Sequence, residues 1–283
     1  MEFSFGDIGI SCDFRGIPLW MDEAAKGFSV MSEGEEKLTY TTEELPAELL
    51  ADYVRIQCTS GYELLQGREG LFLLRHWASL RNAFGFFTEE LRGLTTIYYH
   101  PGLRRLQPMS VSYFLSVIGL HRKLLERDAL ILHAAYVEVR GEGILFLGPS
   151  GMGKSTQGRL WEEQGCGRIL NGDRALLRKR GEQWFVHGYP CCGSTGICIN
   201  RSLPLKALVL LAQDHRNAIQ DLRDSEKLLA LTAGAQFYQW DRAEVQKVFS
   251  LGEALLEAVP MIKLSCTPEQ EAVSCLQNYL STL

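Results

Sequence analysis

The hydrophobic and polar positions of this chain change their period several times, and each change marks a predicted element. Positions 62–74 alternate loosely between apolar and polar residues, and 94–99 are β-branched and aromatic, so both segments are predicted strands. From Pro108 to about Arg127 apolar residues recur at helical spacing, which predicts one helix. We therefore expect residues 1–128 to form a smaller N-terminal region of mixed α+β structure, to which the sequence assigns no role.

The pattern changes at Ala129. Residues 129–139 predict one long strand, and a turn leads to the short buried strand 144–147. A glycine-rich loop follows, and then a helix that ends at Gly165. Strands mixed with helices around one such loop predict an α/β nucleotide-binding domain over residues 129–283. The other elements predicted in this domain are strands at 167–170, 175–179, 184–187 and 207–212 and helices at 225–231 and 268–280.

Charge and hydropathy narrow the classes of partner. The 283 residues carry 29 Lys and Arg against 34 Asp and Glu, a net charge of −5, which argues against nucleic-acid binding. The longest apolar run, 208–212, is much shorter than a membrane span, and the acidic N-terminus has no secretory signal. We therefore expect a cytoplasmic protein without nucleic-acid or membrane partners, and the formation of a homo-oligomer stays open.

The cysteines are typical of a reduced compartment. There are eight of them, and no Cys-x-x-Cys occurs. Cys191, Cys192 and Cys198 form a tight group after His187, and a zinc site there is one interpretation. We favour the other, in which these are small apolar residues around a glycine-rich loop.

The strongest chemical signal follows the strand 144–147. It matches the P-loop pattern Gly-x-x-x-x-Gly-Lys-Ser/Thr, also called Walker A, between an apolar strand and a helix. Glycines let the backbone aim its N–H groups at phosphates, Lys154 can reach the terminal phosphate oxygens, and Ser155 can offer a hydroxyl to Mg²⁺. The motif predicts binding of a nucleoside triphosphate. Its candidate binding residues are Gly148, Pro149, Ser150, Gly151, Met152, Gly153, Lys154, Ser155 and Thr156.

An acidic residue outside the P-loop must help to define which reaction the protein catalyses. The Asn-Lys-x-Asp element of GTPases and the Leu-Ser-Gly-Gly-type signature of transport ATPases are both absent from the sequence. Asp173 and Asp214 each follow a predicted strand and are both candidate metal ligands. We favour Asp173, because one helix and a returning strand after Lys154 would bring it back beside the phosphates.

These motifs, in this order, resemble a known family. His133-Ala134 on a strand, the P-loop, a helix and then Asp173 look like the catalytic domain of HPr kinase/phosphorylase. The arrangement is also similar to HPr-kinase-related kinases, including those acting on lasso-peptide precursors, and more distantly to phosphoenolpyruvate carboxykinase. The resemblance implies a P-loop kinase fold of the HPr kinase/phosphoenolpyruvate carboxykinase type over 129–283, with ATP and Mg²⁺ on the loop. It also implies that a seryl hydroxyl attacks the γ-phosphate and that His133 lies near the reacting centre.

The chain departs from the family pattern at two places. The family's Asp-Asp pair corresponds here to Gly172-Asp173, so one carboxylate is missing. A downstream Glu-x-Arg-Gly-x-Gly motif keeps only its glycines, as Gly193 and Gly196. These changes argue against recognition of HPr and against the reverse phosphorylase reaction, while leaving ATP binding unaffected.

The combined hypothesis is an ATP-dependent kinase that transfers the γ-phosphoryl group to a hydroxyl, expected to be a serine of a peptide or protein. Lys154, Asp173 and His133 are its candidate catalytic residues, and Ser155 and Asp173 its Mg²⁺ ligands. The basic group that assists transfer is not chosen among Arg174, Arg201, Lys206, Arg216 and Arg223. The alternative is a nucleotide-binding regulatory module with weak or no catalysis.

Overall fold

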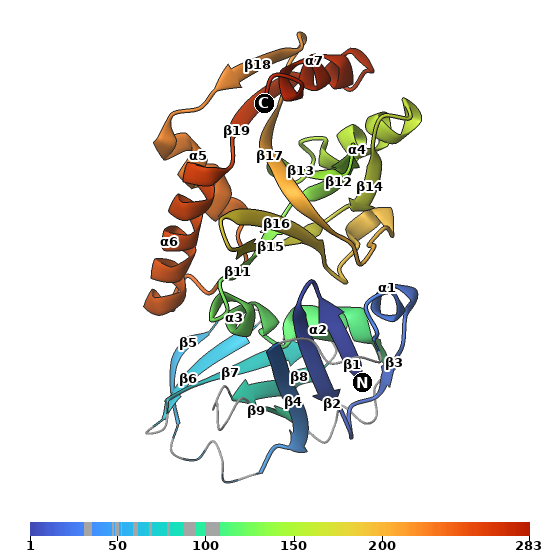
Figure 1. Ribbon diagram of the computed structural model, residues 1–283. Coiled ribbons are helices and arrows are strands. Elements are labelled where there is room, and N and C mark those ends of the chain that lie inside the picture. The colour runs from blue at the N-terminus through green and yellow to red at the C-terminus, as the bar shows by residue number, and fades with distance from the viewer. Residues whose placement is uncertain are drawn as a thin grey trace. The chain divides into compact units, whose positions relative to one another are not determined.

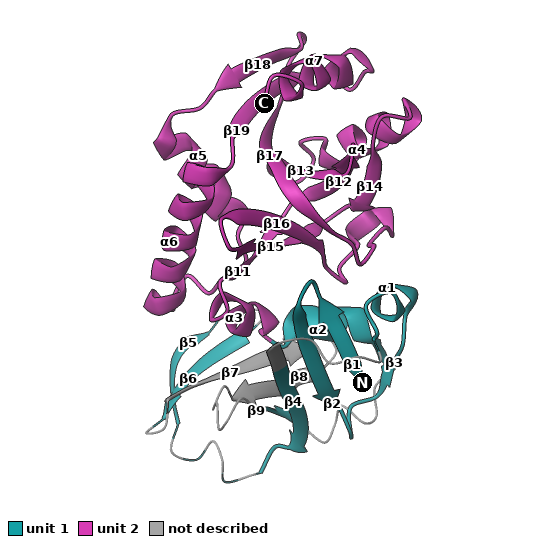
Figure 2. Ribbon diagram, in the orientation of Figure 1, with its two compact units in different colours: residues 1–118 teal, residues 119–283 magenta. Residues whose placement is uncertain are grey.

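The computed structural model describes residues 1–30, 36–46, 48, 51, 53–58, 62–67, 70–77, 80–87, 94–99 and 108–283. The chain divides into two compact units, Met1–Ile118 and Gly119–Leu283 (Figure 2). The division falls ten residues before the boundary that the sequence suggested, 128/129. Helix α3 (Leu120–Leu125) belongs to the second unit because it contacts strand β11 (Ala129–His133) and helix α6 (Arg242–Ala258).

The first unit is built mainly from strands. Among its described residues, eight strands form a sheet in the order β1-β2-β4-β9-β8-β7-β6-β5, and β3 and β10 form a short parallel pair. Phe3 and Phe5 of β1 and Ile8 and Ile10 of β2 are fully buried, as alternation on one sheet face requires. Its elements are β1 (Glu2–Phe5), β2 (Ile8–Asp13), β3 (Leu19–Trp20), α1 (Glu23–Lys26), β4 (Glu36–Glu44), β5 (Val54–Cys58), β6 (Tyr62–Gly67), β7 (Gly70–Trp77), β8 (Leu80–Phe87), β9 (Leu94–Tyr99), β10 (Met109–Ser110) and α2 (Val111–Val117).

The single helix predicted from Pro108 to about Arg127 is wrong. The structure has two short helices, α2 and α3, with Gly119 between them at a φ of 75°. This left-handed conformation is easy for glycine and ends the regular helical path. Ser110 caps α2 by accepting a hydrogen bond from the Tyr113 N–H.

The second unit is a mixed α/β structure around a curled sheet (Figure 1). The strand order is β11-β15-β16-β17-β13-β12-β14, and β19 pairs with both β17 and β18. The strands are β12 (Ala135–Val139), β13 (Glu142–Leu147), β14 (Arg168–Asn171), β15 (Arg174–Arg180), β16 (Gln183–Gly188), β17 (Ser202–Gln213), β18 (Ala218–Asp221) and β19 (Met261–Cys266). The remaining helices are α4 (Lys154–Glu163), the 3₁₀ turn η2 (Gly193–Thr195), α5 (Asp224–Gly234) and α7 (Glu271–Leu280).

The long strand predicted over 129–139 is two strands. β11 pairs with β15, whereas β12 pairs with β13 and β14, so the chain changes partners at Ala134. The Ala134 N–H donates to the carbonyl oxygen of Asp173 at 2.9 Å, which holds this junction in place. As a result His133, the last residue of β11, lies opposite Arg174.

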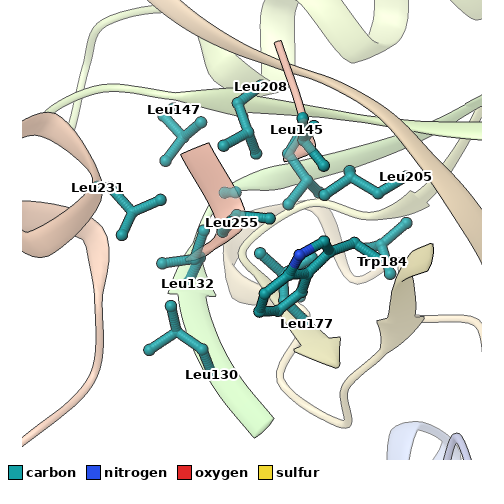
Figure 3. Close-up of a cluster of buried hydrophobic side chains, with 14 of the residues drawn as sticks. Leu130, Leu132, Leu145, Leu147, Leu177, Trp184, Leu205, Leu208, Leu231 and Leu255 are labelled. Carbon is teal, nitrogen blue, oxygen red and sulfur yellow. The ribbon is translucent and has the colours of Figure 1, made fainter. Parts of the chain in front are cut away.

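Helices cover both faces of this sheet, which explains why its central strands are apolar throughout. In β13, Leu145 and Leu147 pack into one core cluster, while Ile144 and Phe146 pack into the other. The first cluster includes residues of α5 and α6, such as Leu231 and Leu255 (Figure 3), and the second includes residues of α4 and α7. Both ends of the glycine-rich segment after β13 are therefore anchored in buried structure. No described helix has the length and apolar character needed to cross a membrane.

Candidate functional site

Residues 148–153, which we call the glycine loop, connect β13 to α4. Gly151 and Gly153 have φ values of 80° and 103°, in the left-handed region that side chains other than glycine rarely adopt. A Cβ at either position would meet no atom within 4 Å, so backbone conformation and not crowding requires glycine there. Gly153 is the N-cap residue of α4, which places the free N–H groups of the first helical turn at the end of the loop.

Lys154 places a positive charge inside this loop. It is the first residue of α4 and is only 7% exposed. Its ammonium donates hydrogen bonds to the carbonyl oxygens of Gly148 at 2.8 Å and Pro149 at 3.1 Å. Burial lowers the pKa of Lys154, and the negative charge of Asp173 acts in the opposite direction. Ser155 and Thr156 follow, both half-buried in the first turn of α4.

Asp173 is held by a turn between β14 and β15. The fully buried Asn171 organises this turn, because its Oδ1 accepts hydrogen bonds from the N–H groups of Asp173 and Arg174, both at 2.9 Å. The Asn171 amide in turn donates to the carbonyl oxygen of Tyr189 at 2.6 Å. The backbone N–H groups of Asp173 and of the residue after it are therefore fixed, which holds the Asp173 carboxylate in position.

Three side chains surround the Asp173 carboxylate. His133 Nε2 is 3.4 Å from Oδ1, Arg174 Nε is 3.6 Å from Oδ2, and the Cys191 thiol donates to Oδ2 at 3.3 Å. The hydrogen bond from His133 is the largest influence lowering the pKa of Asp173, with help from Cys191 and the charge of Arg174, while burial opposes them. The carboxylate is consequently ionised at neutral pH. Burial raises the pKa of the Cys191 thiol, which keeps it a donor.

The segment after β16 closes over this carboxylate. A Cβ at Gly193 would lie 2.7 Å from the Cβ of Asp173, so these two residues are in close contact. A Cβ at Gly172 would overlap the side chain of Thr195. The position at which the family resemblance implies a second carboxylate is thus filled by a threonine side chain from η2.

One expectation about the cysteines is wrong. The sequence indicated reduced, unpaired thiols, but the structure joins Cys192 and Cys198 in a disulfide, with Cα atoms 4.9 Å apart. The pairing closes the segment that carries Gly193 and Thr195, while Cys191 remains a free thiol. Among the described residues no group of three or more His, Cys, Asp and Glu side chains is arranged to hold a metal ion.

Asp214, the alternative acidic candidate, lies elsewhere around the loop. It follows β17, is exposed, and its Oδ1 accepts a hydrogen bond from the His215 N–H at 2.6 Å. It lines a cavity with Gly151 and Gly153. The structure therefore brings His133 and Arg174 to Asp173, places Lys154 in the glycine loop, and leaves Asp214 exposed after β17.

Sequence patterns missed Asn171, Cys191 and Thr195 as parts of this site. Arg174 was one of five basic groups among which the sequence did not choose, and it is the one that contacts Asp173. Its guanidinium is positioned by Gln236, whose side-chain oxygen accepts a hydrogen bond from Nη1 at 2.9 Å. Cys191 and Thr195 reach Asp173 and its turn only through loop closure, which no local motif marks, whereas Asn171 and Arg174 are neighbours of Asp173 in sequence.

The fold and site define a mixed α/β protein with a glycine loop, a buried lysine at the start of α4 and a carboxylate held between His133 and Arg174. The sequence model of the family described as SynChlorMet cassette protein ScmC matches residues 105–266, more than half of the chain. The chain therefore belongs to the ScmC family.

Comparisons with other known proteins give weaker results. The curated proteins contain no significant match to the sequence. Among solved structures, the Hpr(Ser) kinase/phosphatase from Coxiella burnetii is weakly similar, with 11% sequence identity and a TM-score of 0.32. The similarity covers 54% of this chain and 97% of that one.

Proposed function

We propose that this protein is an ATP-dependent kinase that transfers the γ-phosphoryl group to a seryl hydroxyl of a peptide or protein. The observations that carry the proposal are the Lys154 ammonium, buried in the glycine loop, and the Asp173 carboxylate, held by His133 and Arg174. A cation at the N-terminus of a helix and a fixed carboxylate are groups that phosphoryl transfer to a hydroxyl uses.

The glycine loop supplies the phosphate site. Its left-handed glycines leave open space at Gly151 and Gly153, where bulky oxygens can approach the backbone N–H groups. The Lys154 ammonium, now bonded to two loop carbonyls, can exchange these for terminal phosphate oxygens. Phosphate binding would thus combine the N–H groups at the start of α4 with the positive charge of the Lys154 side chain.

A magnesium ion fits the donor set beside the loop. The hydroxyl of Ser155 and the carboxylate of Asp173 are oxygen ligands of the kind Mg²⁺ prefers. When bound, the ion would neutralise charge on the phosphates.

Asp173 orients the acceptor and takes its proton. The seryl oxygen forms a bond to the γ-phosphorus, the bond from that phosphorus to the bridging oxygen of ADP breaks, and the hydroxyl proton passes to the carboxylate. Because the transition state is loose, the proton leaves late, so a carboxylate of low pKa is suitable. Arg174 and His133 fix the direction of the carboxylate, which is where most of the rate gain in such a reaction arises.

A nucleotide-binding regulatory module is the second candidate. It is favoured by the single carboxylate at Gly172-Asp173, with Thr195 packed where a second side chain would stand. Such a protein would bind ATP tightly and turn it over slowly or not at all.

One experiment distinguishes the two candidate functions. The purified protein is incubated with Mg²⁺, γ-labelled ATP and a pool of serine-containing peptides, and label in peptide, ADP formed and ATP bound are measured. A kinase labels peptide in step with ADP formation, whereas a regulatory module binds ATP with no labelled peptide. Absence of ATP binding would contradict both.

A further inference from the structure

Arg174 connects the candidate site to a second set of polar side chains in the same unit. Its Nε lies 3.6 Å from Asp173 Oδ2, and its Nη1 donates to Gln236 Oε1 at 2.9 Å. The Gln236 amide nitrogen lies 3.4 Å from His121 Nδ1, and His121 is only 3% exposed. A chain of side-chain contacts therefore runs from the Asp173 carboxylate to a buried imidazole that has no part in the mechanism above.

The backbone of Gln236 is held by β11. Gln236 lies in the segment between α5 and α6, and its N–H donates to the Ile131 carbonyl oxygen at 2.9 Å. The preceding residue, Ala235, forms a β-bridge with Leu132. The strand that ends at His133 therefore also fixes the backbone of Gln236. Its side-chain amide can still face in either of two directions, and its neighbours decide between them.

The direction of the Gln236 amide determines the tautomer of His121. A guanidinium has only donors, so the amide oxygen must face Arg174 and the amide NH₂ must face His121. His121 Nδ1 must then accept a hydrogen bond, which places the imidazole proton on Nε2. A proton on Nδ1 would bring two donors together and would favour the reversed amide, with its nitrogen against Arg174.

The groups on the other side of His121 agree with this tautomer. Nε2 lies 3.5 Å from Oε2 of the buried Glu244, which offers an acceptor toward the Nε2 proton. That oxygen also accepts a hydrogen bond from the Tyr238 N–H at 2.7 Å, which fixes the carboxylate. Arg122 Nε lies 2.9 Å from the other carboxylate oxygen, so the negative charge of Glu244 is already paired. A neutral imidazole is sufficient here, and burial disfavours a charged one.

We propose that His121 and Gln236 are positioning residues: His121, neutral and protonated on Nε2, keeps the Gln236 amide in the direction that holds Arg174 against Asp173. Without the acceptor at Nδ1 the amide can reverse, and its nitrogen then repels the guanidinium. The effect on phosphoryl transfer rests on the proposed function. The tautomer and the hold on Arg174 are properties of the protein alone and can be measured without a reaction.

Nitrogen NMR on the full chain at neutral pH tests the tautomer directly. The His121 signals, assigned by their loss in His121→Asn, are expected to show a protonated Nε2 and an unprotonated Nδ1. A proton on Nδ1, alone or together with one on Nε2, would overturn the proposal. The Arg174 Nε–H, assigned with Arg174→Lys, should exchange with water about 10-fold faster in His121→Leu than in the wild type, the scale for one lost hydrogen bond. Equal exchange would also overturn it.

Variants in the transfer assay separate positioning from a merely structural effect. His121→Asn keeps an acceptor near the place of Nδ1, so transfer should stay near the wild-type rate, whereas His121→Leu should lose about 10-fold. Gln236→Met should lose a similar factor in the wild type and nothing more in Arg174→Met protein. Gln220→Met, an exposed change on β18, is the control. Equal losses in the two His121 variants, or an undiminished loss from Gln236→Met in the Arg174→Met protein, would leave only a structural role.

The NMR and transfer results fail separately. The expected tautomer and Arg174 exchange, with no transfer by the wild type, would contradict the proposed function and leave the hold on Arg174 established. Transfer by a wild type whose His121 carries a proton on Nδ1 would contradict this inference and leave the proposed function standing. Should His121→Leu not fold, the wild-type tautomer alone decides.

Discussion

His133 and Asp173 are forty residues apart in sequence, yet His133 Nε2 lies 3.4 Å from Asp173 Oδ1. Strand pairing produces this contact, because His133 is the last residue of β11 and pairs with Arg174, the first residue of β15. The hydrogen bond that Ala134 donates to the Asp173 carbonyl oxygen fixes the same junction. A half-exposed imidazole therefore orients a half-buried carboxylate.

Asp173→Asn tests the carboxylate directly. The variant should fold, because Asn171 and not the Asp173 side chain organises the turn. ATP should still bind, while phosphoryl transfer should fall by roughly 100-fold or more, the scale for loss of a positioned acid–base group. Steady-state transfer and calorimetry measure the two effects, and Asp221→Asn on β18 is the matched control. Transfer near the wild-type rate would redirect attention to Asp214 or His133.

Lys154→Ala tests the cation in the loop. Loss of charge-assisted hydrogen bonds to terminal phosphates should weaken ATP binding by roughly 10- to 100-fold and lower turnover with it. Lys227→Ala, which removes a lysine on α5, should leave binding unchanged. Calorimetry with Mg·ATP provides the measurement. Unchanged affinity in a folded Lys154→Ala protein would rule out the phosphate site.

Gly193→Ala tests the close approach of the η2 segment to Asp173. The new methyl would lie 2.7 Å from the Asp173 Cβ, so the carboxylate must shift, and transfer should fall by about 10-fold or more. Gly181→Ala is a matched control, because Gly181 has the same φ of 57° but no atom within 4 Å of its Cβ position. Both variants should lose about 1 kcal/mol of stability from the left-handed backbone. Equal activity of the two variants would contradict the contact.

The environment of Asp173 predicts a pH dependence. Its pKa in the folded protein is below its ordinary value, so its ion pairs favour the native state above the unfolded pKa, about 3.9. That contribution is lost as the pH falls from there through the lower folded value. His133→Ala removes the largest cause of the shift, so the acid limb of the kcat/KM profile should move to higher pH. An acid limb that does not move would show that His133 leaves the carboxylate unaffected.

The disulfide between Cys192 and Cys198 should stabilise the η2 segment. For a closed loop this short, chain entropy predicts a loss of about 2 kcal/mol in Cys192→Ser. Urea denaturation with and without dithiothreitol measures it, and the reductant should destabilise the wild type and leave Cys192→Ser unchanged. Cys58→Ser, an exposed change outside the disulfide, is the control and should respond to the reductant as the wild type does. A wild type insensitive to dithiothreitol would contradict the pairing.

Sequence patterns predicted the structure best where neighbouring residues specify it. The strand 144–147, the glycine loop and the helix after it are specified by neighbouring residues, and the structure places β13 and α4 there. α6 was missed although Val248, Leu251 and Leu255 recur on one face after the N-cap Asp241, so its signal was present. β18 and β19 carry no comparable local signal, since both depend on pairing with each other and with β17.

The sequence by itself determined the conformation of the glycine loop, because the spacing of its glycines and Lys154 sets both the backbone conformation and the position of the charge. Tertiary structure decided what surrounds Asp173. Strand exchange at Ala134 brought His133 to it, Asn171 fixed its turn, and the disulfide-closed segment placed Gly193 against it. The Asn171 turn is local, but the contacts of His133 and Gly193 join residues distant along the chain, and no periodicity or motif encodes such pairings. They form only when the strands of the sheet have paired.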